Sequence, residues 1–345
     1  MDGALPYARG GGAMSIAFAL WCAVAIGFTA TALLRAGRRR GLVGRVPSEP
    51  IVLLRPVDAP TPTELQNLKH LAQGVEQYVV APVPSGAGAW LASDPHGFNR
   101  KLGHIHAALA KLGVMKPVLI VDADVHVDDA LVGALVAGLD SGAALAWASP
   151  APVEPGFERG LLVQSAHSFE VLDAISPGSS PLCGKAMALS PAALEVLRSI
   201  PDCVGEDLEL SKALHRRGLT TRLVARANLP GRRSLEASFA RFTRWMQVLR
   251  AHRGALFPTI PLFFACTPLL MLAAAALDSQ LLTALTAVLV LARFGLAFAL
   301  ERSLSPWWFA GECLLLASWV KSLLLGSRVT WRGRVLHIGA KGVLE

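Results

Sequence analysis

Three groups of charged residues in this sequence have types and spacings suited to chemistry on a phosphorylated substrate. The first is Asp122-Ala123-Asp124, two carboxylates separated by one residue, directly after the apolar run Val118–Val121. Such a pair can hold Mg²⁺ or Mn²⁺, which prefer oxygen ligands and keep other positions for diphosphate oxygens. The cation would neutralise charge on a departing diphosphate. Because acidic residues also commonly end strands, the motif depends on the other two groups for support.

The second group is Glu206-Asp207, in the first turn of a helix predicted to run from Gly205 to Arg217. The helix dipole favours carboxylates at this position, so capping alone explains them. A carboxylate there can instead act as general base on a substrate hydroxyl. The residues by themselves leave both interpretations open.

The third group is Arg241-Phe242-Thr243-Arg244-Trp245, shortly before a long apolar block. Arginines three residues apart share one face of a helix and can clamp a diphosphate. The alternative is a basic membrane flank that contacts lipid headgroups.

These groups lie in a region where short apolar runs alternate with helical patterns. The sequence predicts four buried strands and two helices: strands Ile51–Leu54, Tyr78–Ala81, Val118–Val121 and Ala144–Ala148, and helices Pro62–Leu71 and Asn99–Leu112. This alternation predicts an α/β domain with a largely parallel sheet. Ligands gather at the carboxyl ends of such strands, where the Asp-x-Asp pair is expected.

The composition predicts a membrane protein. Of the 345 residues 53% are hydrophobic and 17% charged, whereas soluble domains carry about 25% charged residues. The apolar run Met14–Leu34 is long enough to cross a hydrocarbon core of about 30 Å. Arginines follow it at positions 35, 38, 39, 40 and 45. We therefore expect an anchor with its basic end in the cytoplasm.

A second apolar block divides into Leu256–Leu277, Leu281–Leu300 and Trp307–Leu325. Prolines at 258, 261 and 268 interrupt its first segment, which predicts a kink or an interfacial piece. Three full crossings would place the basic C-terminal tail outside, so one segment is expected to be interfacial or re-entrant. The predicted regions are a leader, anchor and basic flank (1–46), a cytosolic domain (47–253) and a membrane region with a basic tail (254–345).

Other classes of function have little support in the residues. The net charge of +8 fits nucleic acid, anionic membrane or phosphorylated substrate. No aromatic residues interleave with Arg216-Arg217 or Arg232-Arg233, which favours membrane-surface charge over a nucleic-acid site. The five cysteines form no CxxC pair and are interpreted as buried thiols. Isolated histidines, at 96, 104, 106, 126 and 167, lack the spacing of a metal site.

The three groups, in this order, resemble the D-x-D, E-D and (Q/R)-x-x-R-W series of processive-type family 2 and family 21 glycosyltransferases. Five shorter segments resemble motifs of the ceramide glucosyltransferase family and its bacterial hopanoid-glycosyltransferase relatives. These matches are Leu53-Leu54-Arg55-Pro56-Val57, Gln66-Asn67-Leu68, Asn99-Arg100-Lys101-Leu102, Gly184-Lys185-Ala186-Met187 and Val329-Thr330-Trp331-Arg332-Gly333.

The resemblance implies a GT-A fold with one N-terminal and two to three C-terminal transmembrane helices. It implies inverting transfer from a UDP-sugar to a lipid hydroxyl at the cytosolic face, in a multi-pass protein of the bacterial inner membrane. Asp122 and Asp124 would hold a divalent metal and diphosphate, and Asp207 would be the base with Glu206 beside it. The residues that would bind donor and diphosphate are Arg241, Arg244, Trp245, Lys101 and Lys185.

One departure from the family pattern concerns the uridine site. Family members carry an aspartate after the second strand and a further βα unit. In this sequence no aspartate directly follows Tyr78–Ala81, and the loop to Asn99 is too short for that unit. Asp94 and Asp58 are the nearest acidic candidates.

We therefore expect transfer of a hexose, glucose first, from a UDP-sugar to a ceramide-like lipid, with no nucleic acid involved. One alternative is transfer of N-acetylglucosamine from its UDP-sugar to a hopanoid polyol. The other is a catalytically weakened, lipid-binding protein of the same fold.

Overall fold

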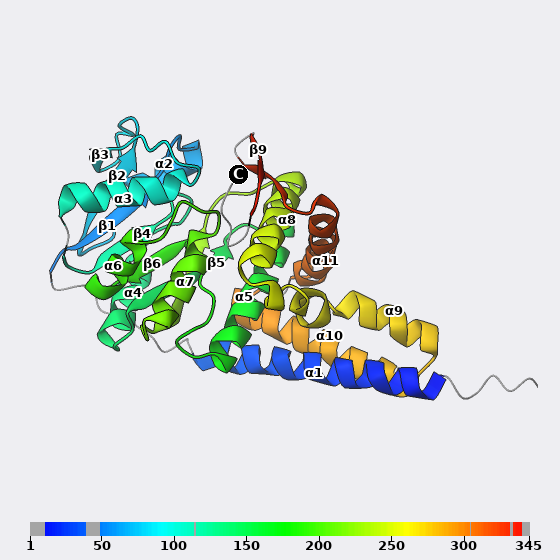
Figure 1. Ribbon diagram of the computed structural model, residues 1–345. Helices are drawn as coiled ribbons and strands as arrows, with labels where there is room; N and C mark the ends of the chain where they lie inside the picture. Colours follow the sequence, from blue (N-terminus) through cyan, green and yellow to red (C-terminus); the bar gives the residue numbers. More distant parts are fainter. Residues whose placement is uncertain (1–10, 39–48, 114, 304, 332–333, 340–345) are drawn as a thin grey trace, which may run out of the picture.

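The computed structural model describes residues 11–38, 49–113, 115–303, 305–331 and 334–339. It consists of an α/β domain and a set of long apolar helices beside it (Figure 1). The predicted leader at 1–10, the arginines at 39, 40 and 45, and the tail residues at 332, 333 and 341 lie outside the described residues.

The α/β domain is built on a seven-stranded sheet of order β3-β2-β1-β4-β6-β5-β7. Its strands are β1 (Ile51–Pro56), β2 (Val75–Ala81), β3 (Ala89–Ala92), β4 (Val118–Val121), β5 (Leu145–Pro152), β6 (Ala186–Leu189) and β7 (Thr221–Leu229). Strand β6 runs antiparallel to both of its neighbours, and every other pair is parallel. The predicted α/β class and largely parallel sheet are confirmed.

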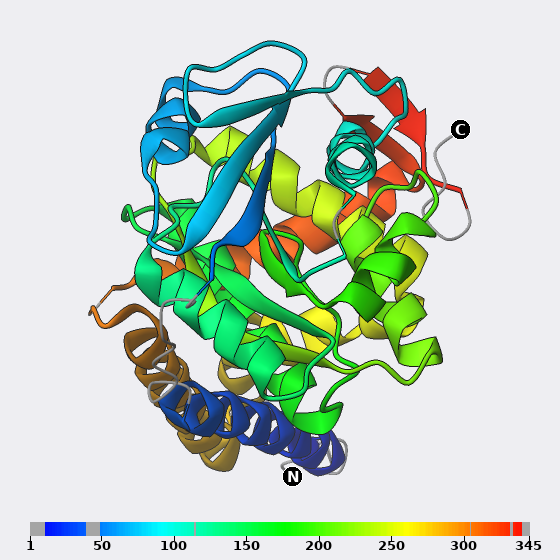
Figure 2. The same cartoon turned by 90° about the vertical axis from the view of Figure 1, so that its left-hand side faces the viewer.

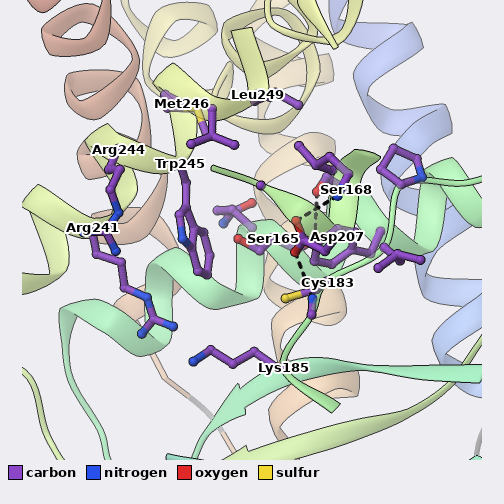
Figure 3. A pocket seen from close by; sticks show the side chains of 18 of the residues that line it. Ser165, Ser168, Cys183, Lys185, Asp207, Arg241, Arg244, Trp245, Met246 and Leu249 are labelled. Atoms are coloured by element: carbon purple, nitrogen blue, oxygen red, sulfur yellow. Dashed lines mark hydrogen bonds between the residues drawn. The ribbon is translucent and has the colours of Figure 1, made fainter. Parts of the chain in front are cut away.

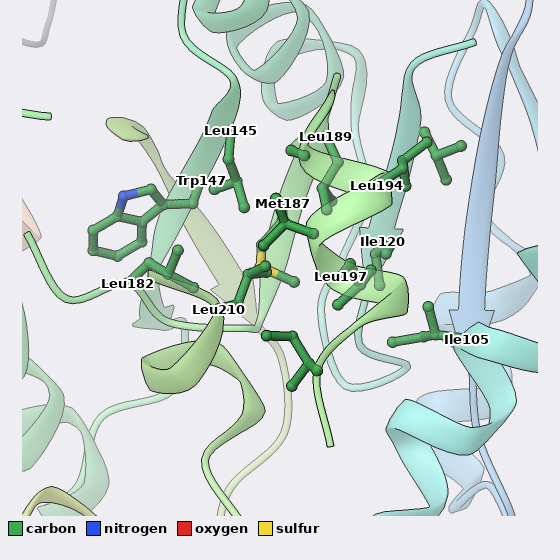
Figure 4. Packing of buried hydrophobic residues seen from close by; sticks show 14 of the residues in the cluster. Ile105, Ile120, Leu145, Trp147, Leu182, Met187, Leu189, Leu194, Leu197 and Leu210 are labelled. Carbon is green, nitrogen blue, oxygen red and sulfur yellow. The ribbon is translucent and has the colours of Figure 1, made fainter. Parts of the chain in front are cut away.

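Helices cover both faces of this sheet (Figure 2). They are α2 (Pro62–Lys69), α3 (Arg100–Leu112), α4 (Asp129–Asp140), α5 (Phe157–Ile175), α6 (Pro191–Arg198) and α7 (Glu206–Arg216). Side chains of α3, α6 and α7 pack with one face of the strands around Trp147, Met187 and Ile120 (Figure 4). Helix α4 packs against the other face. This two-sided core fixes the strand ends that carry the site.

The edge strand β3 follows β2 through a short connection, without the further βα unit of the family pattern. Parallel strands usually need a connection of a dozen or more residues, yet only Pro82–Gly88 joins β2 to β3. The short link suffices because Ala89 pairs with Tyr78, midway along β2, so the chain returns only part of the strand length. Gly86 and Gly88 have φ of +72° and +79°, which permits the tight turn.

The remaining helices are α1 (Gly11–Arg38), α8 (Leu235–His252), α9 (Thr267–Leu277), α10 (Gln280–Glu301) and α11 (Trp307–Leu325), with a 3₁₀ turn at Gly254–Leu256 and a π-helical turn, η3, at Ile260–Phe264. Among the described residues, three helical segments are long and apolar enough to cross a membrane: Ala13–Gly37, Gln280–Glu301 and Trp307–Leu325. The segments Gly254–Phe264 and Thr267–Leu277 form a further pair bent by 53°. This bend confirms the break predicted at the prolines.

A small hairpin, β8 (Arg328–Trp331) and β9 (Arg334–His337), closes the described chain. Val329 and Ile338 pack with Val204 and Val248. The amide of Gln247 in α8 donates to the backbone carbonyl of Gly326, 3.2 Å away. The hairpin therefore supports α8 and the segment that leads into α7.

Candidate active site

A cavity of about 660 Å³ lies where the end of β4 meets α5, α7 and α8 (Figure 3). Its wall contains eight of the nine predicted site residues: Asp122, Asp124, Lys185, Glu206, Asp207, Arg241, Arg244 and Trp245. The ninth, Lys101 of α3, places its ammonium 2.8 Å from Asp122 and 3.3 Å from Glu206. The fold thus brings together three groups that are up to 123 positions apart in the sequence.

The two carboxylates of the Asp-x-Asp motif contact cationic side chains. Lys185 lies 2.9 Å from Asp122 and 2.7 Å from Asp124. Lys101 contacts the other oxygen of Asp122, and Arg233 lies 3.1 Å from Asp124. The site concentrates both signs of charge within one ion-pair network.

A buried arginine holds the backbone of this motif in place. Arg55, at the end of β1, is fully buried and donates to the carbonyl oxygens of Asp122, Ala123 and Val125 at 3.2, 3.3 and 2.8 Å. Asn67 of α2 donates to the Ala123 carbonyl as well. These bonds satisfy carbonyls that the end of the strand leaves without ladder partners.

The donor set of Asp122 and Asp124 fits a divalent cation. Burial alone would raise the pKa of both carboxyls, but Lys101 and Lys185 at Asp122, and Lys185 at Asp124, outweigh it and hold both pKa values below their ordinary range. Both side chains are therefore ionised, as metal ligands must be. Among the described residues no group of three or more His, Cys, Asp or Glu side chains is arranged for a metal. A cation here would take further ligands from the substrate, as Mg²⁺ commonly does.

Asp207 is held with both carboxylate oxygens occupied by backbone donors. The N–H of Gly184 donates to one oxygen at 2.9 Å, and the N–H of Leu208 donates to the other at 2.8 Å. Burial, and then the adjacent charge of Glu206, raise the pKa of Asp207 to about 6. Glu206 itself accepts a hydrogen bond from Asn99 at 2.8 Å. Asp207 thus combines a fixed position with a pKa suited to proton transfer near neutral pH.

Gly205 sets the start of the helix that carries this pair. Its φ is +82°, and a Cβ there would approach Val248 of α8 to 2.5 Å. Glycine adopts this conformation without steric cost. It lets α7 begin directly against α8, so that Glu206 and Asp207 reach the same cavity as the arginines.

The basic motif on α8 is oriented by an acid from α5. Glu158 accepts from Arg241 at 2.6 Å and lies 3.4 Å from Arg233. The Arg241 guanidinium also lies over the ring of Trp245, 4.7 Å from its centroid. Arg244 lines the same cavity one turn further along α8. The cluster can bind an anion with planar, multidentate donors.

Sequence reasoning missed Glu158 and misplaced Arg233. The interpretation of Arg232-Arg233 as membrane-surface charge is wrong for Arg233, which contacts Asp124 inside the site. Arg233 lies eight positions before Arg241, a proximity that could have suggested a shared role. Glu158 precedes Arg241 by 83 positions, and no local pattern in the sequence connects the two.

Residues 85–344 match the sequence profile of glycosyl transferase family 21. This chain belongs to that family. The match covers the Asp-x-Asp pair, Glu206-Asp207 and the arginine motif, and it bears out the resemblance and the GT-A type α/β fold class.

Solved structures similar to this glycosyltransferase include mannosyltransferase PcManGT from Pyrobaculum calidifontis in complex with GDP-Man and Mn²⁺. It is 19% identical, with a TM-score of 0.48, and the match covers 89% of this chain and 98% of that one. Glucosyl-3-phosphoglycerate synthase from Mycobacterium tuberculosis, with Mn²⁺, UDP and glucosyl-3-phosphoglycerate, is 18% identical with a TM-score of 0.39. That match covers 60% of this chain and 81% of the synthase. A search of curated protein sequences found no match.

The two candidates for the uridine-site aspartate are both engaged by one arginine of this glycosyltransferase. Asp58 and Asp94 each lie 2.7 Å from Arg100, and Asp58 also lies 2.8 Å from His104. These pairs tie the end of β1 to the start of α3. Neither aspartate belongs to the described wall of the cavity.

The cavity has a charged end and an apolar end. The charged end carries the two aspartates and the arginines, whereas the apolar end extends toward η3 and α11. The residues of the apolar end are Phe169, Leu172, Met246, Leu249, Leu256, Ile260, Phe264 and Leu315. Asp207 and two serines of α5, Ser165 and Ser168, line the same cavity (Figure 3). An amphiphilic ligand matches this distribution of polarity.

Proposed function

We propose that this family 21 glycosyltransferase transfers a hexose, glucose first, from a UDP-sugar to the hydroxyl of a ceramide-like lipid with inversion at the anomeric carbon. The observation that carries this proposal is the position of Asp207. It lies in one continuous cavity that has cations at one end and apolar side chains beside the membrane helices at the other.

The charged end suits the diphosphate of the donor. Arg241, Arg244 and Lys185 supply fixed positive charge, and Trp245 adds a flat surface. Asp122 and Asp124 would hold Mg²⁺ or Mn²⁺, which would supply further charge neutralisation for the leaving group. Lys101 and Lys185 keep the two aspartates ionised before donor arrives. The aspartates would then exchange lysine contacts for the cation.

The reaction that this arrangement supports is a single displacement. Asp207 accepts the proton of the acceptor hydroxyl while the hydroxyl oxygen forms a bond to the anomeric carbon. The bond from that carbon to the diphosphate oxygen breaks, and its electron pair leaves with UDP. One base on the acceptor side, with Asp207 held by two backbone N–H groups, suffices for this step.

The membrane helices support a lipid acceptor. The cavity reaches Ile260 and Phe264 of the bent segment and Leu315 of α11, so acyl chains could leave it among apolar side chains. The C-terminal ends of α1 and α10 both contact the α/β domain, through Arg35 with Asp173 and Arg159 with Glu301. These contacts and the basic flank support a catalytic domain (47–253) in the cytoplasm of a bacterial cell, with 1–46 and 254–345 as the membrane regions.

The test is sugar transfer by the full-length protein purified in detergent with added Mn²⁺ or Mg²⁺. UDP-glucose and UDP-N-acetylglucosamine are each paired with ceramide and with a hopanoid polyol, and glycolipid is detected by mass spectrometry. Glucosylceramide is the expected product. N-acetylglucosaminyl hopanoid would replace the proposed substrate pair with the alternative one. Folded protein that binds lipid but transfers no sugar would favour the catalytically weakened alternative.

A further inference from the structure

One wall of the cavity carries three polar side chains that the proposed reaction does not use. We infer that Gln164, Ser165 and Ser168 of α5, which we call the α5 ledge, recognise a hydrogen-bond donor on the acceptor headgroup other than the hydroxyl that is attacked. This inference rests on the proposed function in that it assigns the acceptor to this cavity. Beyond the proposed function, it names the residues that select the acceptor lipid and the chemical group of that lipid that they recognise.

The two serines present acceptor atoms to the cavity. Ser165 donates its hydroxyl hydrogen to the carbonyl of Leu161 at 3.4 Å, and Ser168 donates to the carbonyl of Ser165 at 2.8 Å. A serine hydroxyl has one donor and two acceptor lone pairs. With the donors engaged inside the helix, what remains for a ligand is acceptor capacity. Both side chains are half-buried and line the cavity.

Gln164 adds a third acceptor atom. Its Nε2 donates to the backbone carbonyl of Trp308 in α11 at 3.1 Å. A carbonyl oxygen can only accept, so this bond fixes which end of the amide is nitrogen. The opposite end, Oε1, has no hydrogen-bond partner among the described residues, although the side chain is only 2% exposed. A buried acceptor without a partner is costly, and a ligand donor that reached it would remove that cost.

The polarity of the α5 ledge also limits the chemical class of headgroup that it can bind. Lys185, Arg233 and Arg241 are paired with Asp122, Asp124 and Glu158, and α5 itself contributes the apolar Phe169 and Leu172 to the cavity wall next to the ledge in sequence. A phosphate or carboxylate headgroup would meet acceptor oxygens on the ledge, which do not bind an anion. An amide N–H or a second hydroxyl would match. Ser165, Ser168 and Asp207 line the same cavity (Figure 3), so an amphiphile could place one hydroxyl at the base and a second hydrogen-bond donor at the ledge.

The test compares lipids that share the attacked hydroxyl and differ in whether they carry a further hydrogen-bond donor. One pair is ceramide and N-methylceramide, and the other is a hopanoid polyol and its analogue with one hydroxyl. Binding to the full-length protein is measured by native mass spectrometry without donor sugar, and transfer is measured in parallel. Within the lipid pair that the wild type binds, we expect it to bind the lipid with the additional hydrogen-bond donor about tenfold more tightly than its analogue. Gln164→Leu should reduce that preference to less than about threefold, raising KM for the lipid more than it lowers kcat.

Gln73→Leu is the matched control, because Gln73 is exposed in the segment before β2, does not line the cavity and should keep the preference. A Ser165→Ala, Ser168→Ala double variant tests the same ledge if Gln164→Leu does not fold. An unchanged preference in the folded ledge variants, or equal wild-type binding of both lipids in each pair, would overturn the inference. Because binding is measured without UDP-sugar, absence of transfer would count against the proposed function and leave this comparison intact.

Discussion

At the scale of single residues, carboxylates in one cavity have opposite pKa shifts. Asp122 and Asp124 are held below their ordinary pKa values by lysines, whereas burial and Glu206 raise the pKa of Asp207 to about 6. Such a division separates a permanently ionised pair from a group that exchanges a proton. It supports the assignment of metal and diphosphate binding to the first pair and of proton transfer to Asp207.

The pH dependence of the reaction should report Asp207. Only its ionised form can accept a proton, so kcat/KM should rise with pH through a midpoint near 6. Glu206→Gln removes the neighbouring negative charge and keeps an oxygen for Asn99, so the midpoint should move to lower pH. Initial rates between pH 4.5 and 8 would show this. A midpoint that stays in place or rises in the variant would contradict the assignment.

Glu158 should prove necessary for donor use although it is remote in sequence from the motifs. Its contacts with Arg241 and Arg233 orient the anion-binding cluster. Replacing the ion pair with a hydrogen bond from Arg241 to an uncharged amide, as in Glu158→Gln, should lower kcat/KM for UDP-sugar about 10- to 100-fold. Glu236→Gln, an exposed change on α8, is the control and should have no effect. Equal rates in both variants would show that Arg241 does not need Glu158.

The motif residues could be predicted from the sequence because each motif, Asp-x-Asp, Glu-Asp or Arg-x-x-Arg-Trp, spans at most five consecutive positions. It did not predict the contacts between groups. That Lys185 joins Asp122 to Asp124, and that Glu158 binds Arg241, depends on how the antiparallel strand β6 and helix α5 pack. Such pairings have no periodicity in the sequence.

At the scale of elements, the site depends on the contact between α5 and α11. Gly160 and Gly311 let the two helix backbones touch: a Cβ on Gly311 would lie 2.2 Å from the carbonyl carbon of Gly160. The same helices are joined by the bond from Gln164 to the Trp308 carbonyl. Since α5 also carries Glu158 and the α5 ledge, this contact connects the membrane region to the catalytic cavity.

Gly311→Ala should therefore destabilise the protein by about 1–3 kcal/mol, because the added methyl meets backbone that must move. Gly295→Ala in α10 is the matched control, since nothing lies within 4 Å of the Cβ it would add. Thermal unfolding in detergent should show a lower Tm for Gly311→Ala only. A Tm equal to that of the wild type would mean that α5 and α11 can separate at no cost.

Element prediction succeeded where the pattern was strong and failed where tertiary context decides. Strands β1, β2, β4 and β5 and helices α2, α3 and α7 were predicted with ends shifted by up to four residues. Three strands were missed. Strand β3 (Ala89–Ala92) lies at an edge of the sheet, β6 (Ala186–Leu189) is half alanine, and β7 contains arginines at 222 and 226. The first two are only four residues long and rich in alanine, which has a low strand propensity, and the arginines interrupt the apolar pattern of the third.

At the scale of the whole molecule, the apolar helices form two packing groups. Helices α1, α9 and α10 pack together, whereas α11 packs mainly on α5 and α8 and runs across the direction of α1 and α10 (Figure 1). If α1, the bent segment and α10 cross the membrane, the N-terminus and the basic C-terminal tail lie on opposite sides. That arrangement reconciles the apolar segments with the positive-inside rule.

We therefore predict that α11 lies along the cytoplasmic surface of the membrane. Its exposed face carries Cys313, Ala317, Val320 and Leu324. Spin labels at Cys313 and, in a Cys313→Ala background, at Leu324→Cys should lie at similar depth in nanodiscs. A spanning α11 would separate them by about 16 Å along the membrane normal. A label at Val288→Cys in α10 provides the deep reference.

The central claim is that Asp207 is the base of a sugar transfer for which the other residues bind the donor. The most direct measurement compares Asp207→Asn with wild type and with Asp140→Asn, an exposed change at the end of α4, for both UDP binding and glycolipid formation. We predict that Asp207→Asn binds UDP with Mn²⁺ within about threefold of wild type, yet forms glycolipid at least about 100-fold more slowly. Asp140→Asn should match wild type in both. Glycolipid formation by Asp207→Asn at near the wild-type rate would contradict the account.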